Sequence, residues 1–123
     1  MNDIKSIFLT IVTENQNQKI KADNLSELIR NELGENWVIL NIDKYSKFEN
    51  SYKIELKKTF TERNQEELNQ IGISIVDKIV SPWLIYFDND DNSIELIYNK
   101  NENTQIRKME FDVIRWGQLQ ITN

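Results

Sequence analysis

Apolar and polar residues alternate along one stretch of the chain, as they do in β-strands that bury one face. In the stretch 51–60, Tyr52, Ile54 and Leu56 point to one side and the charged residues between them point to the other. The stretch 37–42 also predicts a strand, with one side formed by Val38, Leu40 and Ile42 and the other by Trp37, Ile39 and Asn41.

A near-continuous apolar run occupies residues 83–88. Such a run is typical of a central strand that is buried on both faces. The polar residues 89–92 predict a turn, after which 93–99 return as an antiparallel partner strand. A second polar turn at 101–103 leads to a last strand-like region from Ile106 onward.

Two other stretches carry the apolar stripe of a helix packed on one side. Residues 24–33 form the first, with Asp23 placed to cap its first turn and Gly34 placed at its end. Residues 64–80 form the second, and Asn64 with a glutamate three positions later resembles a capping box. We therefore expect two helices, at 24–33 and 64–80.

The pattern is compatible with helix and with strand in two places. Residues 4–12 match a helical stripe but are rich in strand-forming residues. Within 64–80, Ile71, Ile73 and Ile75 alternate as a strand would, whereas the wider stripe and the single proline that follows favour a helix. We interpret 4–12 as a strand because a leading strand completes the topology described next.

In chain order the expected elements read β-α-β-β-α-β, followed by an antiparallel β extension. That order is the ferredoxin-like, split β-α-β arrangement, with helices on one face of an antiparallel sheet. A chain of 123 residues has room for one hydrophobic core. The sequence therefore predicts a single α+β domain over residues 1–123.

Composition removes most familiar active sites. The chain has no cysteine and no histidine, which excludes disulfides, thiolate nucleophiles, Ser-His-Asp triads and the usual zinc sites. Its three isolated glycines cannot form a phosphate-binding loop. The acidic stretch 88–92 begins like a calcium loop, but Ser93 and Asn99 stand where glycine and glutamate are needed. We expect no catalytic residues, no metal and no cofactor.

The charge balance bears on the class of partner. Lys and Arg number 15 against 20 Asp and Glu, so the formal net charge is −5. Nucleic-acid binding depends on cations that neutralise phosphates, so an acidic chain suits a basic protein partner better. We find neither a signal peptide nor an apolar run of the roughly 20 residues that span a bilayer. The expectation is a cytoplasmic protein without nucleic-acid or membrane contacts.

Aromatic and acidic residues gather in the hairpin region and in the last strand-like region. Interfaces are enriched in buried Tyr, Trp and Arg anchors with a polar rim, and nearby acids would suit a partner rich in Lys and Arg. A competing interpretation places Trp83, Phe87, Phe111 and Trp116 in the core. The candidate partner-binding residues are Tyr86, Asp88, Asp90, Asp91, Glu95, Tyr98, Asp112 and Trp116.

Three segments of the chain, at 81–88, 95–100 and 111–116, together resemble a known group. They read Ser-Pro-Trp-Leu-Ile-Tyr-Phe-Asp, Glu-Leu-Ile-Tyr-Asn-Lys and Phe-Asp-Val-Ile-Arg-Trp. Through these segments the C-terminal third of the chain resembles the small immunity proteins of bacterial contact-dependent growth inhibition and related polymorphic-toxin systems. The resemblance implies a non-catalytic toxin inhibitor that occludes the active site of a cognate toxin domain, often a basic nuclease.

An immunity protein of this kind would act as a monomer in a 1:1 complex. Its association should be salt-sensitive, and exchanging Asp88, Asp90 and Asp91 for Asn should slow it. The alternative is a ligand-sensing or regulatory module, because ferredoxin-like domains often form homodimers that bind small molecules between their sheets. A small histidine-free enzyme with a buried carboxylate or lysine is a third hypothesis.

Overall fold

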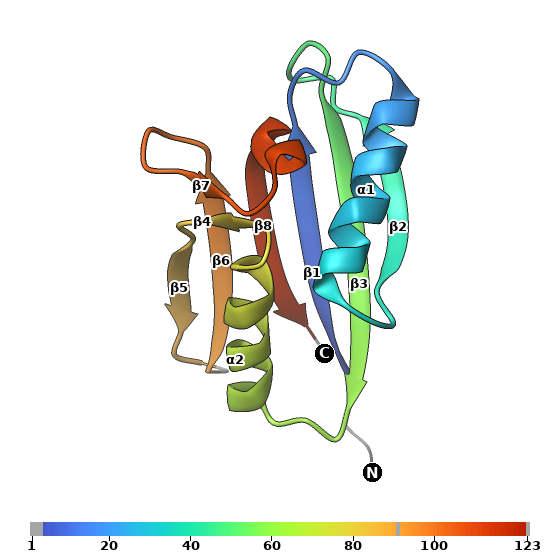
Figure 1. The fold of residues 1–123 in the computed structure, drawn as a ribbon. Helices are drawn as coiled ribbons and strands as arrows, with labels where there is room; N and C mark the ends of the chain where they lie inside the picture. Colours follow the sequence, from blue (N-terminus) through green and yellow to red (C-terminus); the bar gives the residue numbers. More distant parts are fainter. Residues whose placement is uncertain (1–3, 91, 123) are drawn as a thin grey trace.

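The structure is a computed structural model that describes residues 4–90 and 92–122. Six strands form one antiparallel sheet in the order β2-β3-β1-β8-β6-β5 (Figure 1). Their bounds are β1 (Ile4–Thr13), β2 (Val38–Lys44), β3 (Tyr52–Thr61), β5 (Leu84–Asp88), β6 (Ser93–Asn99) and β8 (Ile114–Thr122). Two short strands, β4 (Val80–Ser81) and β7 (Gln105–Ile106), pair with each other in a second sheet.

Two helices cover the same face of the large sheet (Figure 1). Helix α1 (Lys19–Leu33) packs against β2 and β3, and helix α2 (Gln65–Val76) packs against β6 and β8. A short 3₁₀ helix, η1 (Met109–Val113), leads directly into β8. The core lies between helices and sheet, where alternate residues of each central strand are buried; in β1 these are Ile7, Leu9 and Ile11.

The α+β class is confirmed, but the ferredoxin-like strand order is not. The strand predicted at 4–12 exists as β1, and the alternating stretch 51–60 exists as β3. Strands β2, β3 and β1 lie in the order that a split β-α-β unit requires. Beyond them, β8 lies next to β1, and β5, the sheet strand that follows α2, lies at the far edge.

Both predicted helices exist with changed boundaries. Helix α1 begins five residues earlier than predicted, so the prediction that Asp23 caps it is wrong. Asp23 lies inside the helix and pairs with Lys19, Nζ to Oδ1 at 3.4 Å. Gly34 ends the helix as predicted, at φ 110°, with its N–H donating to the Arg30 carbonyl.

The start of α2 is confirmed and its end is not. The Asn64 side chain accepts a hydrogen bond from the Glu67 backbone N–H at 2.8 Å, as the capping box predicts. The helix ends at Val76 rather than at residue 80. The next residues turn into β4, because the Ile79 carbonyl accepts from the Arg107 N–H and Val80 pairs with Ile106.

Candidate functional site

Strand β5 forms an open edge of the sheet. The prediction that the apolar run 83–88 is a central strand is wrong, because β5 pairs with β6 alone and is the last strand in the sheet order. Within the described parts of the chain, nothing pairs with its outer edge. The side chains of Leu84, Ile85, Tyr86 and Phe87 are each between 53% and 58% exposed. An extended apolar edge of this kind is a template for pairing with another chain.

The register with β6 divides the β5 side chains between the two faces of the sheet. Ile85 lies opposite Leu96, which is buried beneath α2, so Ile85 points to the helix side. Tyr86 lies opposite Glu95 and points to the helix-free side. A partner strand added to this edge would therefore meet apolar side chains on both faces.

Trp83 anchors the beginning of β5. Its indole Nε1–H donates to the Val80 carbonyl at 2.8 Å, and its ring contacts the Tyr98 ring with centroids 5.5 Å apart. The absence of a side chain at Gly117 makes room for the Trp83 ring, because a Cβ there would lie 2.5 Å from Trp83 Cη2. This packing against β6 and β8 fixes where the exposed strand starts.

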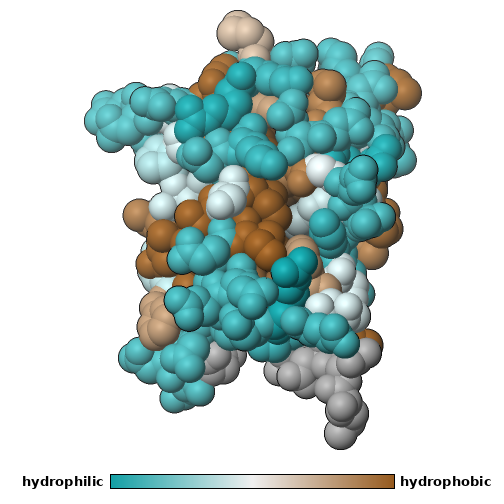
Figure 2. Space-filling model, turned by 60° about the horizontal axis from the view of Figure 1, so that its bottom comes forward, coloured by the Kyte–Doolittle hydropathy of each residue, from teal (hydrophilic) through white to brown (hydrophobic). Residues whose placement is uncertain are grey.

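An apolar groove of about 550 Å³ lies between α2 and β5. Its walls include Ile73 and Val76 of α2, Ile85 of β5 and Leu96 of β6. In Figure 2, hydrophobic surface occupies the middle of the view and reaches its left margin, which is the side of β5 in Figure 1. The groove can take apolar side chains of a strand that pairs with β5.

An acidic hollow of about 620 Å³ lies at the other end of β5. It contains Asp88, Asp90 and Glu95. The Asp88 carboxylate accepts from the Asp90 N–H at 2.9 Å, and the Glu95 carboxylate accepts from the side-chain amides of Gln118 and Gln120. Among the residues that the structure describes, none of the three carboxylates forms an ion pair, so their negative charge is not neutralised locally.

The structure brings together half of the predicted partner-binding residues. Tyr86, Asp88, Asp90 and Glu95 surround the C-terminal end of β5. Asp91 lies outside the described residues.

The prediction of a surface role for Tyr98 is wrong, since its side chain is completely buried. Its hydroxyl is 3.1 Å from Thr104 Oγ1, and burial raises the pKa of Tyr98 above its ordinary value. Tyr98 is a core residue.

Asp112 and Trp116 lie away from this cluster. Trp116 is half-buried at the beginning of β8, opposite Asn99 of β6, whereas Gln120, near the other end of β8, lines the acidic hollow. Asp112 precedes Trp116 and pairs with Lys100, Oδ1 to Nζ at 3.5 Å. These two residues therefore belong to a different surface. The prediction took the eight candidates from the hairpin region and from the last strand-like region, and the expected topology did not show that these regions contribute to different surfaces.

Three residues of the edge were missed, namely Leu84, Ile85 and Phe87. Their hydrophobicity indicates burial, and only the order of the strands reveals that they are exposed. One signal was available in the sequence. Pro82 lies two residues before β5 and directly before the apolar run, and a proline at the beginning of a strand is typical of an edge rather than of the centre of a sheet.

Two other features, a cluster of metal ligands and a membrane-spanning helix, are absent from the described residues. No group of three or more Asp and Glu side chains within them is arranged to hold a metal ion. None of the described helices is both long enough and apolar enough to cross a membrane. Comparison of the chain with protein-family models, with curated proteins and with solved structures finds no match. The edge of β5 is thus the feature on which a function can be argued.

Proposed function

We propose that the protein is an immunity protein that binds a cognate toxin domain along the open edge of β5 and neutralises it by occluding its active site. The observation that carries this proposal is the run of four half-exposed apolar residues, Leu84 to Phe87, on an edge with which no other described strand pairs. Such an edge is normally protected in proteins that act alone. The partner supplies a strand, and backbone hydrogen bonds along β5 hold it.

Charge complementarity selects the class of partner. Asp88, Asp90 and Glu95 lie at the end of the edge without an ion-pair partner among the described residues. A nuclease binds polyanionic nucleic acid in a basic cleft. The same cleft would attract these three carboxylates, which would take the place of the phosphates. The resemblance of the segments 81–88 and 95–100 to immunity proteins points the same way, and these segments contain β5 and most of β6.

The edge of β5 alone is too small for a stable interface, so the partner must cover neighbouring surface as well. A standard stable interface buries roughly 800 Å² on each partner, which is more than a five-residue edge provides. We therefore expect the toxin domain to reach over the apolar groove on one side of β5 and over the acidic hollow at its end. Apolar anchors in the groove then slow dissociation, and the carboxylates speed association.

Co-expression with the C-terminal domain of the protein encoded directly upstream tests the proposal. We expect a 1:1 complex on affinity purification and protection of the host cells. Ile85→Lys should abolish both, because it puts a charge on the pairing edge. Ile20→Lys is the matched control, since Ile20 is similarly exposed, at 57%, but lies on α1. Circular dichroism establishes that both variants fold.

Two results would contradict the proposal. One is a complex that Ile85→Lys and Ile20→Lys affect equally. The other is a homodimer, seen by light scattering, that Ile85→Lys dissociates and that captures no toxin domain, which would favour the regulatory homodimer instead. The double variant Asp88→Asn with Asp90→Asn tests the electrostatic part, and we expect association at low salt to slow several-fold.

A further inference from the structure

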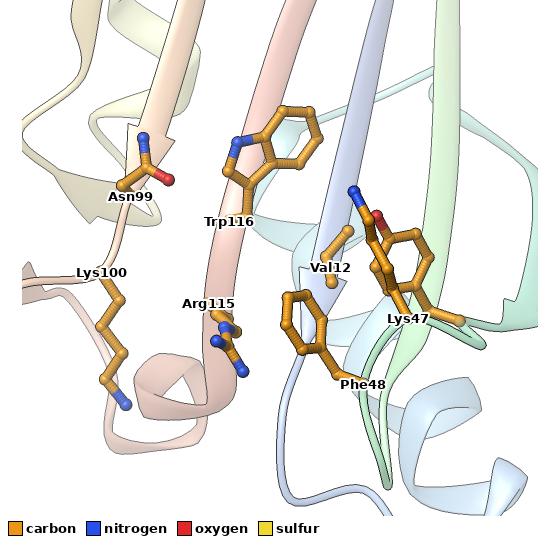
Figure 3. A pocket seen from close by; sticks show the side chains of 8 residues that line it. Val12, Lys47, Phe48, Asn99, Lys100, Arg115 and Trp116 are labelled. Atoms are coloured by element: carbon orange, nitrogen blue, oxygen red, sulfur yellow. The ribbon is translucent and has the colours of Figure 1, made fainter.

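A second hollow, of about 510 Å³, lies on the helix-free face of the sheet, away from the acidic end of β5 (Figure 3). Its floor is Val12 of β1, which is buried. Trp116 and Arg115 of β8 form one wall, and the β2–β3 loop, with Phe48, forms another. The proposed toxin interface uses none of these residues, so the two sites can be tested separately.

The loop that forms the second wall is held by backbone hydrogen bonds. The Tyr45 N–H donates to the Ser51 carbonyl at 2.8 Å, and the Asn50 carbonyl accepts from the Gln16 N–H at 2.8 Å. The rings of Tyr45 and Phe48 contact each other with centroids 5.8 Å apart. The hollow is therefore preorganised, and binding does not have to order the loop first.

Two cations at the hollow lack acidic partners among the residues that the structure describes. The Arg115 guanidinium lies over the Phe48 ring, 3.8 Å from its centroid, and Lys47 extends from the loop. Neither forms an ion pair with any carboxylate that the structure describes. Both are exposed at the rim. In a chain of net charge −5, two uncompensated cations beside aromatic rings form a local site for an anion.

Lys100, the third cation at the hollow, is already neutralised. Its ammonium is 2.7 Å from Glu14 Oε2 and 3.5 Å from Asp112 Oδ1. Partial burial alone would lower the pKa of Lys100, but its hydrogen bond to Glu14 and the charges of both carboxylates outweigh burial and raise it. Lys100 thus remains charged and braces the rim, while Arg115 and Lys47 are available to a ligand.

We propose that this hollow binds a nucleoside monophosphate. The half-exposed Trp116 ring provides a flat surface on which a base can stack, whereas the Phe48 ring is covered by the Arg115 guanidinium. Arg115 and Lys47 are the phosphate ligands, with the guanidinium fork already oriented by its contact with Phe48. The side-chain amide of Asn99 stands beside Trp116 and can both donate to and accept from a base edge. The volume lies within the usual range for small-ligand sites, about 300–1,000 Å³.

Isothermal titration with adenosine 5′-monophosphate at low ionic strength tests this site. We expect 1:1 binding with a Kd below about 1 mM, and at least tenfold weaker binding of adenosine and of inorganic phosphate. Arg115→Gln should weaken binding about tenfold or more, and Lys47→Gln several-fold. The control is Arg63→Gln, because Arg63 lies outside the hollow and pairs with Glu67, and it should leave the Kd unchanged.

Three outcomes would overturn the proposal. The first is that the nucleotide does not bind at about 1 mM. The second is that adenosine binds as tightly as the nucleotide, which would mean that the phosphate contributes nothing. A single-stranded adenine oligonucleotide could bind more than tenfold tighter than the mononucleotide, which would identify a nucleic acid as the ligand. If Arg115→Gln unfolds the protein, Lys47→Gln in the exposed loop still decides whether the cations hold the phosphate.

Discussion

At one edge of the sheet β2 carries the features that prevent pairing with other chains, whereas at the other edge β5 carries few of them. The register of β2 with β3 shifts between Ile39 and Asn41, and β2 ends in the charged residues Asp43 and Lys44. Helix α1 also packs against β2. Strand β5 keeps an unbroken register with β6 and is apolar until Asp88, while α2 packs on β6 and β8 instead.

This difference between the two edges shows that the exposure of β5 is a local property of its own edge and does not follow from the fold as a whole. Bulges, charges and covering helices are the usual protection of an edge, and β2 has all three. The same chain forms β5 with one charge, at its end, and an open groove beside it. Strand β2 also exposes apolar side chains, Val38 at 55% and Leu40 at 48%, but its bulge, its charges and α1 interrupt pairing. The edge that lacks this protection therefore favours a partner at β5.

The largest expected effect is the loss of unfolding free energy when a core leucine near each edge is truncated. Leu56 is buried between Leu9 and Ile39, on the β2 side. Leu96 is equally buried but lines the groove beside Ile85, so water can enter the space that its truncation leaves. We expect Leu56→Ala to lower the free energy of unfolding by about 4 kcal/mol and Leu96→Ala by about 2–3 kcal/mol. Urea denaturation measures both, and an equal or reversed order would contradict an open β5 side.

A smaller effect is expected where β5 is anchored. A methyl group at Gly117 would lie 2.5 Å from Trp83 Cη2 and 3.3 Å from Ile11 Cδ1, so Gly117→Ala must displace the ring that fixes the start of β5. We expect a loss of about 1–3 kcal/mol in unfolding free energy. Gly72→Ala is the matched control. Its added methyl would meet the flexible end of Leu119 at 3.1 Å, and alanine favours the helix, so its effect should be close to zero.

The displaced ring should also weaken partner capture at β5. In the pull-down with the proposed toxin domain, Gly117→Ala should retain less partner than Gly72→Ala does. Identical stability and identical capture for the two variants would contradict the anchoring role of Trp83.

Elements with a local cause could be predicted from the sequence, and the strand order could not. The alternation in 51–60 and the cap at Asn64 depend on neighbouring residues, and both are confirmed. The start of α1 was missed because its N-cap residue, Gln18, makes no side-chain cap. The pairing of β8 with β1 joins residues about a hundred positions apart, such as Ile11 with Gly117, and no local pattern indicates it.

The candidate site shows the same division. Tyr86, Asp88 and Asp90 were predicted together because they are close in sequence, and they are close in space. The error over Tyr98 was avoidable, since Ile94, Leu96 and Tyr98 alternate along β6 and all three are buried. The error over Ile85 could not be avoided by the same argument, because hydrophobicity predicts a strand but does not place it within the sheet.

The smallest expected effect is a loss of stability at alkaline pH, caused by ionisable groups in and directly after β6, the strand that pairs with β5. Burial raises the pKa of Tyr98 above 10.0, and the pKa of Lys100 lies above 10.5, because Glu14 and Asp112 outweigh its partial burial. The folded protein therefore binds these protons more tightly than the unfolded chain does. Their contribution to stability is complete below about pH 10 and is lost as the pH rises through the raised folded-state values.

Two single variants separate this contribution from the general effect of alkali. Tyr98→Phe removes the titrating hydroxyl and its bond to Thr104, which costs about 1 kcal/mol at neutral pH. Lys100→Met removes a partly exposed ion pair, which is worth less than about 1 kcal/mol. Between pH 9 and pH 11 the unfolding free energy of each variant should fall less steeply than that of the unaltered protein, because one proton less is lost. Parallel slopes for all three proteins in urea titrations would mean that neither group couples ionisation to folding.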